Sequence, residues 1–533
     1  MKMVMMTSAA LAACAGQALG DLSYGEPVLE ARSAFATGFN LPAGIGAISA
    51  IDVSSSGAIV TRAVVAIEPF PEPTPSQAND IFINTIEDAL LFGGVGQGLG
   101  FVTRTGPDET SVIDDNGTPG DFSDDFMVTF DLVPLPTTFS SFLSGASVAS
   151  DDTVLFFLRS VGAGTITGFF EFDPAAPPAS AISVVALDTF GSSASASGVS
   201  ATRRLADGSF IFVQGNDDDT VFAVNADQSD SEEVYSTADQ AGGLPPFITF
   251  DNGGSFGDLS TNGLFVAVQR FEFTDQTNTD QFAVIERIEI DSVDPLLPAS
   301  VNELESTESV TSTYSSFLGS PDVNSTGQVV YLATRRDNGL QELVLEDGSS
   351  QVVIITEGGS LDGVTIIDLG VQFNPRIGDS GKVVFFATDD QGTTGIWITD
   401  GTEIASVASL GCTLQVDDLT DVDGDSNVTE ITREFVITSF SPNIAINAND
   451  TIVFTASDIV NGMSETGSSI FSIQPGVFSL ADVNGDQILD ADDYNAYLAA
   501  LVSQNLDVAE LNNDAPADAF DLGVFGNLLA KGF

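Results

Sequence analysis

The chain of 533 residues has 43% hydrophobic residues and carries 76 acidic but only 15 basic side chains, a formal net charge of -61. Nucleic acid is disfavoured as a partner, because phosphate contacts require a face of lysine and arginine, and the charge suits a saline environment that screens self-repulsion. Histidine is absent, which excludes Ser-His-Asp and Cys-His catalysis, imidazole bases and His-ligated zinc.

The first 20 residues, MKMVMMTSAALAACAGQALG, combine an early lysine with an apolar run and small residues before Asp21. This pattern predicts an export signal at 1–20, cleaved after Gly20, and hence a secreted or cell-surface protein. The tetrapeptide LAAC (11–14) also allows lipid attachment at Cys14, which would make the protein a lipoprotein of the cell envelope. No other apolar run predicts a transmembrane segment.

From residue 25 onward, seven segments repeat a turn residue followed by a strand of β-branched and aromatic residues. The turn residues are Gly57, Asp152, Gly208, Gly263, Gly327, Gly381 and Asp450. Glycine or aspartate gives the backbone freedom of a tight hairpin, and the alternation that follows suits a strand. Further apolar strands follow most of these segments, such as TGFFEFD (167–173), SQVVIIT (350–356) and GIWITDG (395–401).

Three or four short strands per unit, repeated this often, predict a mainly β fold, with a β-propeller of about seven blades over 21–476. The long interval between Gly57 and Asp152, which contains the acidic stretch VIDDNGTPGDFSDDF (112–126), has room for an eighth blade. We expect YGEPVLEARSAF (24–35) to add an outer strand to the last blade near Ile470 and close the ring. A chain of separate β-sandwiches is the alternative fold.

The phrases SPDVNSTGQVVYLAT (320–334) and NPRIGDSGKVVFFATDDQGTTGIWITDG (374–401) resemble the tandem β-repeat proteins of secreted bacterial families. The resemblance covers most of 25–476 and implies no known activity. Trp397, the one tryptophan, lies in such a strand phrase, so we expect it in the core.

The C-terminal stretch DVNGDQILDADD (482–493) fits a twelve-residue calcium loop, in which ligands stand at positions 1, 3, 5, 7, 9 and 12. The predicted ligands are Asp482, Asn484, Asp486, the carbonyl of Ile488, Asp490 and Asp493. A second stretch, ELNNDAPADAFD (510–521), repeats the register with Glu510, Asn512, Asp514, the carbonyl of Pro516, Asp518 and Asp521. An amphipathic stretch follows each loop, so we predict a small all-α calcium module at 477–533.

Position 6 of such a loop normally holds glycine, because the chain turns there with positive φ, but here it holds Gln487 and Ala515. A side chain at that position costs about 1–2 kcal/mol, so we expect calcium affinity to fall about tenfold. A third stretch, DVDGDSNVTEIT (421–432), starts with the same spacing at Asp421, Asp423 and Asp425. It ends on Thr432 instead of a carboxylate, so the sequence leaves calcium binding there open.

Two loop-helix units without an incoming helix resemble a type I dockerin over about 480–533, which implies a cohesin-like partner for that segment. We therefore expect an exported, non-enzymatic propeller for interaction or display, with calcium as its cofactor and a polysaccharide or surface glycan as a candidate ligand. The alternatives are a polysaccharide-degrading hydrolase or lyase that uses carboxylates, and an envelope lipoprotein. The sequence does not identify a catalytic pair of carboxylates.

Overall fold

A computed structural model of the chain describes most of the β-rich region. The described residues are 24, 27–33, 45–67, 85–95, 99–104, 109–114, 126–131, 133, 135, 139–142, 146–149, 151–160, 167–187, 199–214, 220–227, 230–236, 255–273, 281–370, 372–418, 431–460 and 466–475. The predicted export signal and the predicted calcium module lie outside them. Within the described residues, no helix is long and apolar enough to cross a membrane.

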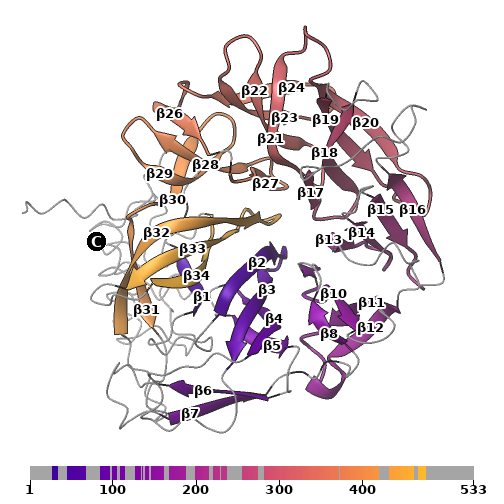
Figure 1. The fold of residues 1–533 in the computed structure, drawn as a ribbon, viewed down its shortest axis with the longest axis vertical. Helices are drawn as coiled ribbons and strands as arrows, with labels where there is room; N and C mark the ends of the chain where they lie inside the picture. Colours follow the sequence, from indigo (N-terminus) through magenta and orange to yellow (C-terminus); the bar gives the residue numbers. More distant parts are fainter. Residues whose placement is uncertain are drawn as a thin grey trace, which may run out of the picture.

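Seven antiparallel sheets stand radially around a central axis as the blades of a β-propeller (Figure 1). Blade 1 contains β2 (Ile45–Val53), β3 (Ala58–Ile67), β4 (Thr85–Gly94) and β5 (Gly100–Arg104). Blade 2 contains β8 (Phe139–Phe142), β9 (Ser147–Val148), β10 (Val154–Ser160), β11 (Thr167–Phe172) and β12 (Ile182–Leu187). Blade 3 contains β13 (Val199–Arg204), β14 (Phe210–Gln214), β15 (Thr220–Val224) and β16 (Ser231–Ser236).

Blade 4 contains β17 (Ser255–Leu259), β18 (Phe265–Phe273), β19 (Gln281–Glu289) and β20 (Ser300–Ser306). Blade 5 contains β21 (Tyr314–Val323), β22 (Val329–Arg335), β23 (Gln341–Glu346) and β24 (Gln351–Thr356). Blade 6 contains β25 (Ser360–Leu361), β26 (Val364–Leu369), β27 (Arg376–Ile377), β28 (Val383–Asp389), β29 (Thr394–Thr399) and β30 (Ile404–Ser409). Blade 7 contains β31 (Thr413–Asp418), β32 (Ile431–Ile446), β33 (Ile452–Val460), β34 (Thr466–Ile473) and β1 (Val28–Ser33).

The N-terminal strand closes the ring, as the sequence predicted. Strand β1 pairs antiparallel with β34, with Ala31 opposite Ile470, and becomes the outermost strand of blade 7. Figure 1 shows it in indigo beside the yellow strands of the C-terminal part. The last blade is thus assembled from both ends of the propeller region, which leaves no gap between blades 7 and 1.

The long interval in blade 1 does not hold an eighth blade among the residues described. It contains a hairpin of two strands, β6 (Glu109–Asp114) and β7 (Phe126–Asp131), which form a separate sheet. This hairpin lies outside the ring in Figure 1, below β5. The described strands therefore give seven blades, and they exclude a chain of separate sandwiches.

Each interface between neighbouring blades encloses its own cluster of buried hydrophobic side chains. The clusters join blades 1 and 2, 2 and 3, 3 and 4, 4 and 5, 5 and 6, 6 and 7, and 7 and 1. Successive residues of a strand point to opposite faces, so Phe385 packs toward blade 5 whereas Val384 packs toward blade 7. Both faces of a blade are therefore buried, which explains the continuous apolar runs in the sequence.

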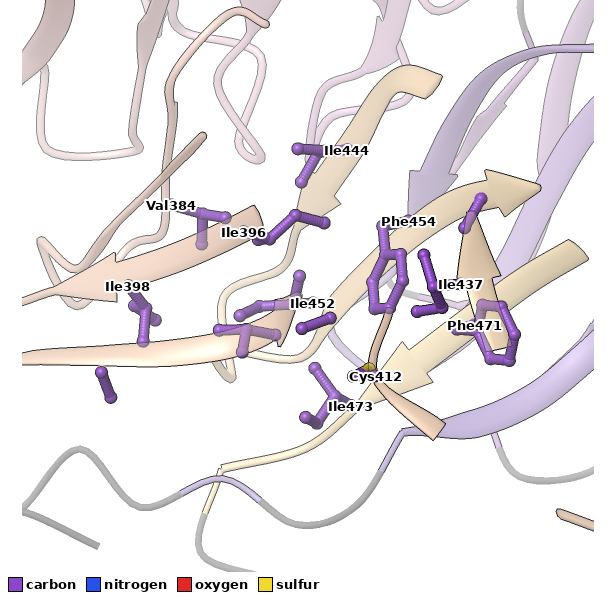
Figure 2. Packing of buried hydrophobic residues seen from close by; sticks show 14 of the residues in the cluster. Val384, Ile396, Ile398, Cys412, Ile437, Ile444, Ile452, Phe454, Phe471 and Ile473 are labelled. Carbon is purple, nitrogen blue, oxygen red and sulfur yellow. The ribbon is translucent and has the colours of Figure 1, made fainter. Parts of the chain in front are cut away.

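The interface between blades 6 and 7 illustrates this packing (Figure 2). Ile396 and Ile398 of β29 face Ile452 and Phe454 of β33, and all four side chains are fully buried. Trp397, between the two isoleucines, points to the opposite interface with blade 5, where its Nε1 donates a hydrogen bond to the Ala387 carbonyl oxygen. The expectation that this tryptophan belongs to the core is confirmed.

Candidate functional site: the turn ring and its charged neighbours

Seven equivalent turns connect the inner strand of each blade to the next strand. In every turn the backbone N–H of the last residue donates to the carbonyl oxygen three residues earlier. The residue pairs are 54 and 57, 149 and 152, 205 and 208, 260 and 263, 324 and 327, 378 and 381, and 447 and 450. The last residue has positive φ in all seven cases, including Asp152 and Asp450, so the seven predicted turn residues are confirmed. We call these seven turns together the turn ring.

Hydrogen bonds between neighbouring turns connect the turn ring across blade boundaries. Between blades 7 and 1, Asn447 Nδ2 donates to the Ser54 carbonyl oxygen at 2.6 Å. Between blades 5 and 6, the Ser325 amide donates to Asp379 Oδ1 at 2.8 Å. Asp379 also accepts a 2.6 Å hydrogen bond from Thr261 Oγ1 of blade 4, which passes over the turn of blade 5. The turns therefore constrain one another, and not only their own blades.

Two ion pairs lie just behind the turn ring on the inner strands. Arg203 of blade 3 reaches past blade 2 to Asp52 of blade 1, with Nη1 and Oδ2 2.6 Å apart. Asp52 Oδ2 also accepts a hydrogen bond from the amide of Val148 in blade 2, so one carboxylate connects three blades. On the other side of the ring, Asp322 Oδ2 accepts the Ile377 amide, and Arg376 Nη1 lies 3.5 Å from Asp322 Oδ1. These contacts connect the inner strands of blades 1, 2 and 3 on one side, and those of blades 5 and 6 on the other.

The solvent-facing part of the turn ring consists of small polar side chains. The exposed ones are Ser56, Asp151, Asp207, Thr261, Thr326, Ser380 and Asn449, with Ala206 as the one exposed apolar member among the described turn residues. Hydrogen bonds from Thr153 lower the pKa of Asp151, so this carboxylate stays charged. The turn ring therefore offers many hydrogen-bonding groups to solvent, and its exposed side chains among the described residues are all small.

A second polar cluster lies between blades 4 and 5, where one amide contacts two carboxylates. Gln351 Nε2 lies 3.3 Å from Glu305 Oε2 and 3.3 Å from Glu346 Oε2, and Tyr331 donates to Glu346 Oε2 at 3.0 Å. Burial raises the pKa of Glu346, and the negative charges of Glu305 and Asp347 act in the same direction. A carboxyl group whose pKa is raised keeps its proton to higher pH than an ordinary one, which is the property required of a proton donor.

Other buried carboxylates serve the packing of the blades. Glu286 accepts hydrogen bonds from Tyr235 at 2.8 Å and from Arg270 at 2.7 Å, which joins blades 3 and 4. Within blade 5, Glu342 accepts hydrogen bonds from Tyr314 and Arg335. Burial raises the pKa of Tyr314, with the Glu342 charge next in size, so its hydroxyl stays protonated. Their shared role is to hold strands together by neutralised, hydrogen-bonded pairs.

None of the predicted metal ligands falls within the described part of the chain. These residues are Asp482, Asn484, Asp486, Ile488, Asp490, Asp493, Glu510, Asn512, Asp514, Pro516, Asp518 and Asp521. The acidic stretch with Asp421, Asp423 and Asp425 lies in another segment outside it. Within the described residues, no group of three or more His, Cys, Asp or Glu side chains could hold a metal ion. Calcium binding at the two C-terminal loops therefore stays a prediction, and calcium binding at 421–432 stays open.

No family model matches the chain, and no curated protein matches it. Among solved structures, polysaccharide lyase Uly1 matches 85% of this chain and 99% of its own at 10% identity, with a TM-score of 0.38. An oligogalacturonate lyase from Vibrio parahaemolyticus matches 68% of this chain and 99% of its own at 14% identity, with a TM-score of 0.30. A puromycin-hydrolyzing peptidase from Mycobacterium tuberculosis matches 79% of this chain and 61% of its own at 11% identity, with a TM-score of 0.31. Likeness this low carries no argument about activity.

The family resemblances inferred from the sequence are therefore wrong. Neither the tandem β-repeat families nor type I dockerin is supported, because no family model matches any part of the chain, and the described residues contain no α-helix. A cohesin-like partner was implied by the dockerin resemblance alone, and the described residues do not test it. The physical reason is composition: with 76 acidic residues among 533, a carboxylate spacing typical of one family also arises without kinship.

Sequence reasoning missed the polar clusters between the blades. A weak signal was present, because Arg270, Glu286 and Glu342 each interrupt an apolar strand at a position where alternation predicts a buried side chain. A buried charge requires a partner, but the sequence does not say which of many carboxylates or arginines provides it. Only the radial arrangement of the blades brings residues such as Asp52 and Arg203 together.

Proposed function

We propose that the protein is exported and acts as a binding platform that is not an enzyme, with the turn ring as its contact surface. The observation that carries this proposal is the surface itself: seven equivalent turns, several of them joined to one another by hydrogen bonds, present small polar side chains. A rigid surface binds with little loss of conformational entropy, which favours recognition.

A neutral polysaccharide or surface glycan is the ligand class that fits this surface best. Sugar hydroxyls both donate and accept hydrogen bonds, as do the serine, threonine and asparagine side chains of the turn ring. The net charge of -61 repels a polyanion, so a uronic-acid polymer is a poorer candidate. Binding should therefore persist at high salt, because it does not depend on charge attraction.

The test is a panel of neutral, cationic and anionic polysaccharides, screened for binding at low and high salt. Ala206→Trp places a large ring on the turn ring at an exposed position without removing a contact, so it should reduce glycan binding at least about tenfold. Ser183→Trp, on the exposed edge strand β12 far from the turns in sequence, is the matched control and should bind normally. Equal binding by both variants would place the contact surface elsewhere.

The second candidate is a polysaccharide-degrading enzyme, and one observation favours it. Glu305 and Glu346 lie at the same Gln351 amide, and burial raises the pKa of Glu346, so the two carboxyls have different environments. Glycoside hydrolysis uses such a pair, one as proton donor and one as base or nucleophile. Release of reducing ends or unsaturated products from the same panel, abolished by Glu346→Gln, would support the enzyme over the platform.

We also propose that the two C-terminal loops bind calcium, on the strength of their complete oxygen register. Calorimetry on the full chain should detect calcium binding that Asp482→Ala weakens. Gln487→Gly should tighten it about tenfold, because glycine adopts positive φ without strain. A calcium titration without heat or helicity change would contradict the proposal.

We further propose that the protein is exported through its N-terminal signal. Mass spectrometry of the mature protein should find a new N-terminus at Asp21. A diacylglyceryl group on Cys14 would instead support the envelope lipoprotein.

A further inference from the structure

The described residues contain four Asp–Gly dipeptides in turns, at 207–208, 347–348, 362–363 and 400–401. An Asp–Gly bond can rearrange without any enzyme, because glycine has no side chain to hinder attack by its own amide nitrogen on the preceding carboxyl carbon. Two conditions control this attack: the amide nitrogen has to be free of hydrogen bonds, and the carboxyl has to be free to rotate toward it. The fold imposes very different conditions at the four sites.

At three of the four dipeptides, hydrogen bonds hold the aspartate carboxylate, and at two of these they hold the glycine amide as well. Asp400 Oδ1 accepts the amides of Thr402 and Glu403, and the Gly401 amide donates to Thr399 Oγ1. At 207–208, the carboxylate accepts the Ser209 amide at 2.9 Å, and the Gly208 amide donates to the Leu205 carbonyl oxygen.

Asp347 is held still more firmly. Its two carboxylate oxygens accept the backbone amides and the hydroxyls of both Ser349 and Ser350. These bonds lower the pKa of Asp347 well below its ordinary value, with the Ser349 hydroxyl as the largest cause. A carboxylate held ionised in this way is a poor electrophile, because only the protonated acid carries a hydroxyl group that can leave as water.

The fourth dipeptide has neither constraint among the described residues. No hydrogen bond involves the Asp362 carboxylate, and the Gly363 amide donates none to the backbone. Both residues are exposed and have positive φ, 49° and 80°, as in the two-residue turn of a tight hairpin. A methyl group at Gly363 would meet nothing within 4 Å, so there is open space for a ring to form.

We propose that 362–363 is a modification site at which Asp362 converts spontaneously to isoaspartate through a succinimide. The Gly363 nitrogen forms a bond to Asp362 Cγ, and its proton leaves with the carboxyl hydroxyl as one water molecule. Hydrolysis then adds one water molecule to either ring carbonyl. Opening at Cγ restores aspartate, whereas opening at the backbone carbonyl gives isoaspartate, with no net change in composition and no co-reactant.

The conversion has a structural consequence because it inserts a methylene group into the main chain of a two-residue turn. That turn sets the register of β25 and β26, where Leu361 pairs with Val364. Leu361 and Val364 also pack against the hydrophobic cluster between blades 5 and 6. Isoaspartate at 362 should therefore loosen this hairpin and leave the rest of blade 6 in place. Its amount should increase with the age of the protein.

The experiment is to age the purified full-length protein at about 37 °C and high salt, and to locate isoaspartate by electron-transfer fragmentation mass spectrometry. We expect isoaspartate at 362 to accumulate at least about tenfold faster than at 347 and 400, because hydrogen bonds hold the carboxylates at those two sites in place. A parallel sample unfolded in denaturant should lose this selectivity, because the hydrogen bonds at the other three sites disappear.

Two variants at position 362 test the chemistry of this site directly. Asp362→Asn keeps a residue that accepts positive φ and should react faster through the same succinimide, giving a mass increase of about 1 Da. Asp362→Glu should give no product at this site. Equal rates at all four dipeptides in the folded protein, or no isoaspartate at 362 after ageing, would overturn the proposal.

Discussion

At the scale of single residues, the side chain with the most informative environment is Glu346. Burial raises its pKa above the ordinary value of 4.5, the charges of Glu305 and Asp347 add to the rise, and hydrogen bonds from Tyr331 and Gln351 oppose it. A raised pKa in the folded state means that the proton binds the folded protein more tightly than the unfolded chain. The resulting stabilisation is present below pH 4.5 and is lost as the pH rises through the raised value.

Glu346→Gln tests this linkage, because the neutral amide has no proton to lose. We expect the free energy of unfolding of the variant, relative to the natural protein, to increase as the pH rises from about 4 to about 8. Urea unfolding at both pH values provides the measurement. Glu303→Gln, at an exposed position of β20, is the matched control and should show a smaller pH dependence. If the difference in unfolding free energy between Glu346→Gln and the natural protein did not change with pH, the raised pKa of Glu346 would be contradicted.

At the scale of elements, the closing strand β1 depends on buried charges. Arg32 Nε lies 2.8 Å from Asp458 Oδ1 of β33, and both side chains are fully buried. The guanidinium also lies 5.6 Å from the centroid of the Phe435 ring. Nearby, Ser472 of β34 donates a hydrogen bond to Glu30. These contacts fix the register of β1 and oppose pairing in a shifted register, which would bury Arg32 without its partner.

Arg32→Met should therefore destabilise the propeller by about 3–5 kcal/mol, because it leaves the Asp458 carboxylate buried and unpaired. The double variant Arg32→Met/Asp458→Leu should cost much less than the sum of the two single changes, since neither charge remains. Urea unfolding at high salt gives both values, with Val28→Ala, a half-exposed position on the same strand, as control. Additive costs would mean that the pair does not hold the strand.

At the scale of the whole molecule, acidic residues outnumber basic ones 76 to 15, and most of the basic side chains that the structure describes are buried or half-buried. Nine of the described basic side chains are buried or half-buried: Arg32, Arg62, Arg203, Arg204, Arg270, Arg287, Arg335, Arg376 and Lys382. Arg336 is exposed, but its guanidinium donates to the carbonyl oxygens of Thr307, Ser312 and Tyr314. With a net charge of -61, the outer surface therefore repels itself unless salt screens it.

Stability should consequently rise with salt. The Debye length falls from about 10 Å at 0.1 M to about 3 Å at 1 M, so most of the repulsion between exposed carboxylates is removed over this range. We expect the thermal unfolding midpoint to rise by more than about 4 °C between 0.1 M and 2 M NaCl, corresponding to 1 kcal/mol or more. Sucrose, which is excluded from protein surfaces without screening charge, is the control for general stabilisation. An unchanged midpoint in NaCl would contradict surface repulsion.

The sequence by itself determined the repeated unit, the seven turn residues and the closing strand. These features are local: a hairpin turn needs a residue that accepts positive φ, as at Gly208 or Asp450, and a strand between two blades needs apolar residues on both faces. The partner of the N-terminal strand was predictable because an unpaired edge remained on the last blade. The family resemblances failed, because carboxylate spacing is weak support for kinship in so acidic a chain.

Only the tertiary structure decided which distant residues meet. Asp52 and Arg203 lie 151 positions apart, and Thr261 and Asp379 lie 118 positions apart, yet each pair is in contact because the blades converge on one axis. The meeting of Glu305 with Glu346 through Gln351 depends in the same way on how two blades pack. The choice of turn residue and the alternation of apolar residues along a strand depend on a few neighbouring positions. The charged side chains behind the turn ring find their partners only because the blades are arranged radially around one axis.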